Sequence, residues 1–149
     1  MTKIEPASAG APEGWEPFSA PDTFIDFVGP LHRKREGKGM RLGLRVEQRH
    51  CNRQPFCHGG MLSALCDMLI SFSALRESKA PGGVTVNMNV DFLGIVARGA
   101  WLEGYAVPRK IGNQLVFVDC TLYADGQEAV RANGIWKPRR AESKKTEAA

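Results

Sequence analysis

The chain has 149 residues, of which 43% are hydrophobic and 24% charged, as in a single soluble globular domain. Its amino-terminal segment lacks the apolar core of a secretory signal. Its longest apolar run is shorter than the roughly 20 residues that span a membrane and contains a carboxylate, Asp67. We therefore expect a cytoplasmic protein that does not contact a membrane.

The basic residues gather in three clusters. The formal net charge is +4, and the excess lies at 32–38, 109–110 and 137–145. Such clusters favour anionic partners, including a small molecule that carries phosphates. No aromatic residues interleave with these charges and no known nucleic-acid motif accompanies them, so we expect no nucleic acid partner.

The cysteines do not indicate a metal site. None of the four belongs to a CxxC pair, and disulfides are not expected in a chain without an export signal. We therefore expect no metal and no cofactor. Cys57 directly precedes His58, which raises the alternative of a thiolate nucleophile. Adjacency in sequence does not create the spatial Cys/His pair that such chemistry needs.

The first half of the chain is predicted to hold one short helix and one strand. Residues 1–21 are rich in Pro, Ala, Gly and Ser, which is typical of a flexible tail. The stretch 22–31 predicts a short helix, capped by Asp22 and stopped at Gly29–Pro30. After a turn at 36–39, residues 40–48 alternate apolar and mostly polar side chains, which predicts a half-buried strand.

A buried helix is predicted from residue 59 to residue 75, because apolar residues there go nearly all the way round. Within it, one stripe consists of small residues and one acid. Its members are Gly60, Ser63, Ala64, Asp67, Ser71 and Ala74. Small side chains leave room for another backbone, a partner helix or a ligand.

Only strands are predicted after about residue 80. The segment 84–92 alternates valine, methionine and phenylalanine on one face with Thr85 and other polar residues on the opposite face. Three more strands follow, with a turn at 110–113 and a hairpin signal at Asp125–Gly126. One long helix and four strands in a meander predict an α+β domain over 22–138, followed by a flexible basic tail at 139–149.

The position of Asp67 allows two interpretations. A buried carboxylate costs several kcal/mol unless it is paired or hydrogen-bonded, so Asp67 can simply cap a neighbouring loop or accept bonds from Ser63 and Ser71. The functional interpretation rests on the His-Gly-Gly that begins the same helix. Free backbone N–H groups at a helix start bind a negatively charged oxygen, so this helix carries the components of an oxyanion hole and a base.

Helix geometry adds a constraint to the functional interpretation. Gly60 and Asp67 are about 10 Å apart along the axis at 1.5 Å per residue. A thioester or ester centre must lie about 3 Å from both the donors and the base. One helix cannot serve both roles for one substrate, whereas two antiparallel helices can. We therefore predict sites shared across a two-fold dimer interface.

The motif N-x5-HGG-x6-D, formed by Asn52, His58, Gly59, Gly60 and Asp67 and followed by GVTVNMNVDFL, resembles a known family. It is similar to the hotdog-fold acyl-CoA thioesterases of the phenylacetate-degradation branch, and the resemblance runs from about residue 24 to residue 136. It implies a long helix wrapped by a curved antiparallel sheet of five to six strands, homodimers, and commonly a dimer of dimers.

The resemblance also implies roles for single residues. Asp67 would be the nucleophile or the general base that activates water. The N–H of Gly59, with Gly60 beside it, would polarise the thioester carbonyl. His58 and Asn52 would orient the carbonyl and the loop. Thr85 would hold the attacking water or Asp67.

Substrate contacts are expected from a second group, which consists of Gly60, Phe92, Arg109 and Lys110. The Lys110 position matches one that contacts coenzyme A in the family, and Arg109 would assist with the phosphates. The chain departs from the family pattern at Pro55, where a glycine is common, and in the loop 94–99, which lacks the usual prolines. Pro55 stiffens its loop and is followed by Phe56, so we expect this loop to give the acyl pocket a different shape.

The reaction implied by the resemblance is hydrolysis of an acyl-CoA to a free acid and coenzyme A, in which coenzyme A is part of the substrate. Two alternatives belong to other classes. One is a non-catalytic protein that binds an acyl-CoA or an aromatic acid. The other is a hotdog hydratase or dehydratase. Binding alone needs no buried acid, and the arrangement of Asn52 and Asp67 fits a thioesterase better than a dehydratase.

Overall fold

The structure is a computed structural model that describes residues 10–140. One long helix, α2 (Gly59–Ser78), separates two groups of strands. Before it come β1 (Glu16–Phe18), α1 (Phe24–Val28), β2 (Leu31–Glu36), β3 (Gly39–Arg45) and the 3-10 turn η1 (Gln48–His50). After it come β4 (Gly83–Phe92), β5 (Trp101–Ile111), β6 (Val116–Ala124) and β7 (Gln127–Pro138).

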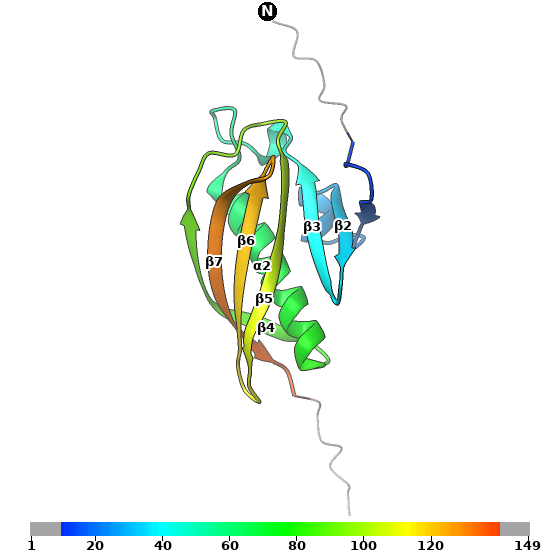
Figure 1. Cartoon of the computed structure of the whole chain (residues 1–149), viewed down its shortest axis with the longest axis vertical. Helices are drawn as coiled ribbons and strands as arrows, with labels where there is room; N and C mark the ends of the chain where they lie inside the picture. The colour runs from blue at the N-terminus through cyan, green and yellow to red at the C-terminus, as the bar shows by residue number, and fades with distance from the viewer. Residues whose placement is uncertain (1–9, 141–149) are drawn as a thin grey trace, which may run out of the picture.

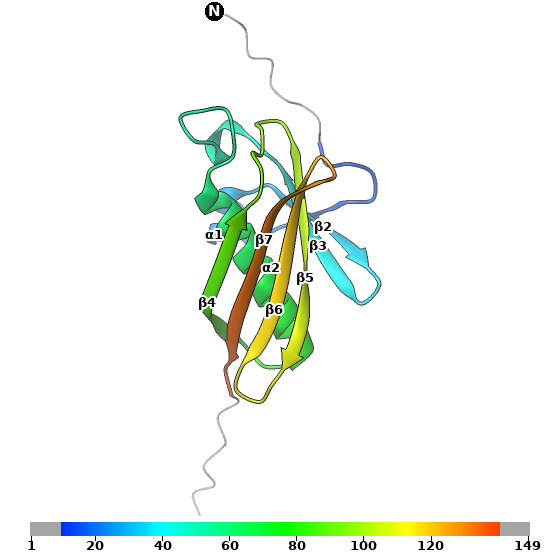
Figure 2. The same cartoon turned by 60° about the vertical axis from the view of Figure 1, so that its left-hand side comes forward.

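All strands join one antiparallel sheet that curves around α2 (Figures 1 and 2). This confirms the expected α+β class and the helix wrapped by a sheet. The sheet has seven strands, in the order β1-β2-β3-β5-β6-β7-β4, rather than five to six. The two unforeseen strands are β2, which lies in the basic cluster 32–38, and β1, which lies inside the segment 1–21 expected to be a tail. Residues 1–9 and 141–149 of the expected tails lie outside the described residues.

The expected meander of four strands is wrong for β4. Of these four strands, only β5, β6 and β7 follow one another as hairpins. Positive φ angles at Asp125 (48°) and Gly126 (83°) form the tight turn between β6 and β7. β4 pairs with β7, and β5 pairs with β3. Residues 93–100 carry the chain from the edge strand β4 to β5, which lies between β3 and β6 in the middle of the sheet. No short-range signal marks this crossing, because it follows from the sheet closing around the helix.

The short helix α1 forms where expected, but its cap differs. Thr23 is the N-cap residue, and Asp22 precedes it with a φ of 61°. The acid that fastens this segment is Asp26, which accepts a hydrogen bond from Ser19 Oγ at 2.9 Å and another from the Ala20 N–H at 2.8 Å. Asp22 is therefore a turn residue and not the cap.

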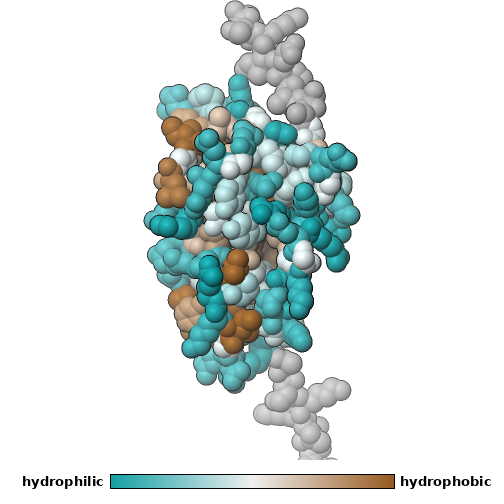
Figure 3. Space-filling view, viewed as in Figure 1, coloured by the Kyte–Doolittle hydropathy of each residue, from teal (hydrophilic) through white to brown (hydrophobic). Residues whose placement is uncertain are grey.

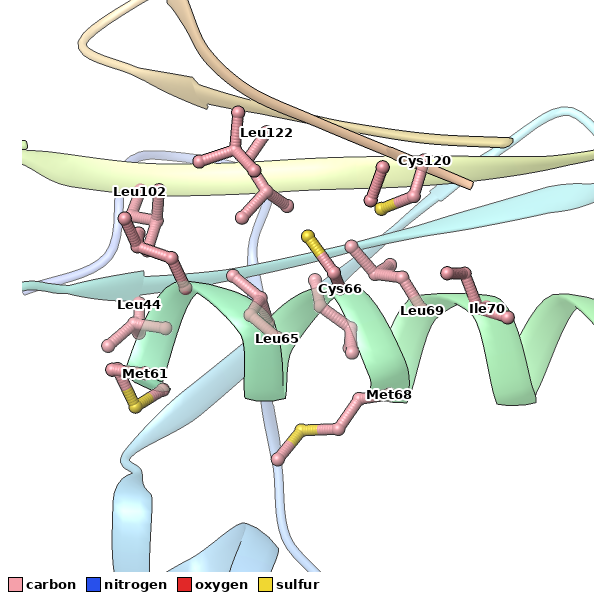
Figure 4. Close-up of a cluster of buried hydrophobic side chains, with 14 of the residues drawn as sticks. Leu44, Met61, Leu65, Cys66, Met68, Leu69, Ile70, Leu102, Cys120 and Leu122 are labelled. Carbon is pink, nitrogen blue, oxygen red and sulfur yellow. The ribbon is translucent and has the colours of Figure 1, made fainter. Parts of the chain in front are cut away.

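The core lies between α2 and the concave face of the sheet. Figure 4 shows Leu65, Cys66 and Leu69 of α2 directed toward side chains of the sheet, while Met68 points to the other side of the helix. Nine α2 residues from Met61 to Ala74 are buried, as the apolar pattern predicted. The small-residue stripe remains half-buried at Ser63, Ala64, Asp67 and Ser71. Within residues 10–140, no helix is long and apolar enough to cross a membrane.

Two glycines on the sheet allow α2 to lie close to it. A Cβ at Gly104 would collide with Leu122 Cδ2 and lie 3.0 Å from Leu69 Cδ1. A Cβ at Gly134 would lie 2.9 Å from Ile70 Cδ1. The distance between helix and sheet, and with it the position of Asp67, therefore depends on the absence of side chains at these positions.

We predict that Gly104→Ala lowers the free energy of unfolding by about 1–3 kcal/mol, because the added methyl overpacks the core. Urea denaturation followed by circular dichroism measures the change. Gly94→Ala is the matched control, since a Cβ at Gly94 meets nothing within 4 Å. Equal stability of the two variants would contradict the packing argument.

Candidate active site

Asp67 is held by a side chain from the edge strand. Thr85 Oγ1 donates a hydrogen bond to Asp67 Oδ1 at 2.6 Å, and Ser71 Oγ lies 3.2 Å from Thr85 Oγ1. Because the single hydroxyl proton of Thr85 is directed at the carboxylate, Ser71 donates to Thr85. The structural interpretation expected direct hydrogen bonds from Ser63 or Ser71 to Asp67. The structure shows neither bond among residues 10–140. Among residues 10–140, only Thr85 hydrogen-bonds the Asp67 side chain, so one carboxylate oxygen is fixed and the other is open.

A bulge in β4 turns Thr85 toward Asp67. Thr85 pairs with Trp136 of β7 and Asn87 pairs with the next residue, Ile135, so Val86 is the extra residue of the bulge. After the bulge, Met88 packs against the core, on the same side as Thr85. The strict alternation predicted for 84–92 put Thr85 on the opposite face and is wrong at this point.

The start of α2 offers one free amide rather than two. His58 is the N-cap residue, and its Nδ1 accepts a hydrogen bond from the Gly60 N–H at 2.8 Å. The Gly60 amide is therefore occupied, whereas the Gly59 N–H has no acceptor among residues 10–140. Because Nδ1 is an acceptor here, the His58 proton lies on Nε2, and the exposed ring can donate outward.

Several predicted site residues meet beside this helix start. A Cβ at Gly59 would lie 3.2 Å from Phe92 Cζ, so the Phe92 ring rests on the glycine. Gly59 and Phe92 line a cleft of about 470 Å³ together with Asn52 and Phe56. The Asn52 N–H donates to the Phe56 carbonyl at 2.9 Å, which closes the loop that brings both residues to the cleft.

A second cavity, of about 620 Å³, lies on the other side of the helix start. His58 and Gly60 line it together with Met61 and with Phe24 and Phe27 of α1. Phe24 and Phe27 are exposed in the protomer. The helix start thus stands between two spaces lined by aromatic and polar side chains, each large enough for a small organic group.

The two basic candidates lie far from the helix start within one protomer. Arg109 and Lys110 belong to the last residues of β5, at the end of the molecule where α2 finishes (Figure 1). Arg109 Nε forms an ion pair with Asp119 Oδ2 at 2.6 Å. Lys110 is exposed and makes no ion pair within residues 10–140. The structure therefore does not bring either of them to the helix start of the same protomer.

His50 is a structural residue of this region that sequence reasoning missed. It is buried, its Nε2 donates to the Val28 carbonyl at 2.7 Å, and its Nδ1 accepts from the Glu47 N–H at 2.9 Å. Its carbonyl accepts from the His58 N–H at 2.8 Å. His50 therefore ties the end of α1 to the cap of α2. A lone histidine among charged residues gave no signal of this role.

Burial changes two pKa values near the site. Burial raises the pKa of Cys57 to about 12, so its thiol stays protonated near neutral pH and the thiolate alternative is not supported. Burial also lowers the pKa of His50, against the smaller opposite effect of its bond to the Val28 carbonyl. The neutral ring fits both hydrogen bonds, because a proton on Nδ1 would break the bond from Glu47.

We predict that acid destabilises the fold through His50. Because its folded pKa lies below the unfolded value of about 6.5, its contribution is complete above pH 6.5 and is lost as pH falls toward the folded pKa. Thermal melts between pH 7.5 and pH 5 should show a smaller loss of stability in His50→Gln than in the wild type. An unchanged profile in His50→Gln would count against this assignment.

Comparisons with known proteins identify the family of this chain. Residues 54–130, just over half of the chain, match the model of the family described as "Thioesterase superfamily". A Pseudomonas aeruginosa protein, PA0474, which is named provisionally as an esterase, is 28% identical over 127 residues that cover 84% of this chain and 95% of that protein.

Two solved structures illustrate the likeness in fold. One is a mutant of the phenylacetic acid degradation protein PaaI from Thermus thermophilus, with a TM-score of 0.70 and 18% identity over 78% of this chain and 98% of that chain. The other is smu.793 from Streptococcus mutans UA159 bound to acetyl CoA, with a TM-score of 0.68 and 20% identity over 76% of this chain and 94% of that chain. The hotdog fold expected from the sequence is confirmed, and PaaI lies in the branch that the motif resembles.

Proposed function

This chain belongs to the thioesterase superfamily, and we propose that it hydrolyses an acyl-CoA thioester to a free acid and coenzyme A. The observation that carries the proposal is the half-buried carboxylate of Asp67, which Thr85 holds by one oxygen while the other remains open. A free helix-start amide at Gly59 supplies the complementary donor. The neighbour of similar fold that is bound to acetyl CoA supports a thioester of coenzyme A as the substrate class.

In the proposed reaction, the open oxygen of Asp67 accepts a proton from water as the water oxygen attacks the thioester carbon. Thr85 keeps the carboxylate in one orientation. The Gly59 N–H stabilises the oxyanion that forms, and His58 holds the helix start by accepting the hydrogen bond from the Gly60 N–H. When the carbon–sulfur bond breaks, the proton passes from Asp67 to the leaving sulfur. Direct attack by the same carboxylate is the alternative for the first step.

The two groups must come from different protomers, since about 10 Å of helix rise separates Asp67 from the start of its own α2. We propose a two-fold dimer in which β4 strands pair edge to edge and α2 helices lie antiparallel. β4 is the last strand of the sheet, and Val84, Val86 and Phe92 on it are exposed. In Figure 3, hydrophobic residues gather along the left-hand side, where β4 runs. The small-residue stripe of α2 permits the close approach.

This arrangement also gives a role to the basic candidates. In an antiparallel pair of protomers, the end of one α2 lies beside the start of the other. Lys110, exposed and unpaired within residues 10–140, is then proposed to contact the phosphates of coenzyme A bound at the shared site, with Arg109 as a neighbour. Family resemblance suggests that two such dimers associate further.

We predict that Asp67→Asn lowers the rate of thiol release by 10²–10⁴-fold, on the order of the contribution of a general base. The measurement follows free thiol colorimetrically on a panel of short, medium and aromatic acyl-CoAs. Glu128→Gln, the same change at an exposed carboxylate, is the control. Near-wild-type turnover in Asp67→Asn would remove this residue from the mechanism. Binding without thiol release would favour a binding protein, and a change in unsaturation without thiol would favour a hydratase.

We predict that shared sites can be rebuilt from two inactive variants. Gly59→Pro removes the amide donor at the first helical position, where proline is otherwise tolerated. Mixing Gly59→Pro with Asp67→Ala should restore one intact site per mixed dimer and thus part of the activity. Gly59→Ala is the control for the added Cβ, which meets Phe92 but keeps the N–H. No recovery after subunit exchange, verified by mass spectrometry, would contradict sites built from two protomers.

A further inference from the structure

The outer part of the β2–β3 hairpin leaves the sheet. β3 pairs with β5 only from Leu42 opposite Gly104 to Arg45 opposite Trp101, although β5 continues to Ile111. Beyond that ladder the hairpin tip diverges from β5 in both views (Figures 1 and 2). A cavity of about 580 Å³, here called the hairpin cavity, lies between the hairpin, the carboxyl-terminal half of α2 and Ala106 of β5.

The pleat of β2 directs arginines into this cavity. Arg33 is opposite Leu42 and Arg35 is opposite Met40, and residues that pair directly share one face of a sheet. Leu42 is fully buried, so this is the inner face. Lys34, between the two arginines, points to the outer face. Both arginines line the cavity at positions where a half-buried strand normally carries apolar residues.

The mouth of the cavity is cationic. Arg33, Arg35 and Lys38 line it from the hairpin, Arg76 lines it from the last turn of α2, and no acidic residue lines it. Arg76 pairs with Glu77 at 2.8 Å, whereas Arg35 and Lys38 make no ion pair within residues 10–140. Arg33 Nε forms a longer ion pair with Glu16 Oε2, at 3.5 Å, and makes no hydrogen bond. Donors are therefore left over for an anion.

The floor of the cavity is apolar. It consists of Phe18, Met40, Leu69, Phe72, Leu75 and Ala106. The rings of Phe18 and Phe72 pack edge to face with centroids 5.5 Å apart, which gives the floor a defined wall. An apolar floor beneath a cationic rim matches a ligand that has a hydrocarbon body and an anionic end.

The hairpin cavity is separate from the candidate active site of the same protomer. Arg76 follows Asp67 by about 2.5 helical turns, which places it on the opposite side of α2. Leu69 and Phe72 line the hairpin cavity, and none of its lining residues lines the cleft that holds Gly59 and Phe92. The two spaces therefore lie on different faces of one helix.

We propose that the hairpin cavity binds an aliphatic carboxylate. The hydrocarbon chain of the ligand lies on the floor formed by Met40, Leu69 and Phe72. Its carboxylate accepts hydrogen bonds from Arg35, with Lys38 and Arg33 on the same rim. An ionised guanidinium that faces an apolar wall is stabilised when an anion pairs with it. The carboxylate of the ligand therefore supplies the anionic partner that Arg35 of β2 lacks within residues 10–140. This binding does not depend on thioester hydrolysis and is testable without it.

Dodecanoate is the probe, and ¹³C-labelled methionine methyl groups give a local readout by NMR. Met40 lies in the hairpin cavity and Met61 lies beside His58, so the two methyl signals distinguish binding at each place. Titration should shift Met40 saturably. Arg35→Glu should weaken that binding at least about tenfold, as expected for loss of a charged hydrogen bond. Lys34→Glu, the same change one residue away on the outer face, should leave it unchanged.

Further arms identify the ligand class. Dodecyltrimethylammonium, with the same chain and opposite charge, should not compete, and Asp67→Asn should bind dodecanoate at Met40 as the wild type does. The proposal is overturned if dodecanoate leaves the Met40 signal in place, or if Arg35→Glu and Lys34→Glu weaken binding equally. It is also overturned if 3′,5′-ADP shifts Met40 at lower concentration than dodecanoate, because the rim would then serve a nucleotide. Lys38→Glu makes the same charge change at a turn residue of the rim and should also weaken the binding of dodecanoate.

Discussion

The hydrogen bond from Thr85 to Asp67 joins the central helix to the outermost strand of the sheet, and the candidate active site is organised around it. A carboxylate on a helix that is apolar nearly all round needs a partner, and a single donor at 2.6 Å meets this need without surrounding the acid. Full enclosure by two or three donors would stabilise the charge further but would leave no oxygen for a substrate. One hydrogen bond therefore stabilises the Asp67 carboxylate and leaves its second oxygen able to react.

The start of the same helix shows a similar division between support and function. His58 satisfies the Gly60 amide and leaves the Gly59 amide free, so one of two adjacent donors is used to hold the cap. His50, buried and bonded on both ring nitrogens, fixes the backbone of His58 from behind. The helix then places its acid and its free amide too far apart to act together in one chain. The strand that supplies Thr85, β4, is also an edge strand, so the element that completes Asp67 is the one through which a second copy is proposed to approach.

The sequence predicted those parts of the fold that local periodicity encodes. The apolar residues of α2 and the alternation in β3 and in β5 to β7 recur at regular spacing, and the meeting of Asn52, Gly59 and Phe92 follows from the motif. The pairing of β4 with β7 was not predictable in this way, because it depends on a sheet closing around a helix and on the path of residues 93–100. The short strand β1 and the hydrogen bonds of His50 likewise depend on tertiary contacts, and no periodicity in the sequence indicates them.

Two strands, β4 and β2, turn polar side chains toward the inner face of the sheet at positions where periodicity predicts apolar ones. In β4 an extra residue, Val86, breaks the alternation and turns Thr85 inward to Asp67. In β2 the register is regular, but arginines occupy the inner positions at 33 and 35, so no alternation of apolar and polar residues indicates a strand there. A strand gains nothing in stability from either departure, since a polar group turned toward a core must find a partner. Departures from a local rule that bring no packing advantage are expected at functional sites. By this reasoning two separate polar positions lie on opposite sides of α2. One is Asp67, held by Thr85, and the other is the rim of the hairpin cavity, where Arg35 of β2 is left to pair with an anion.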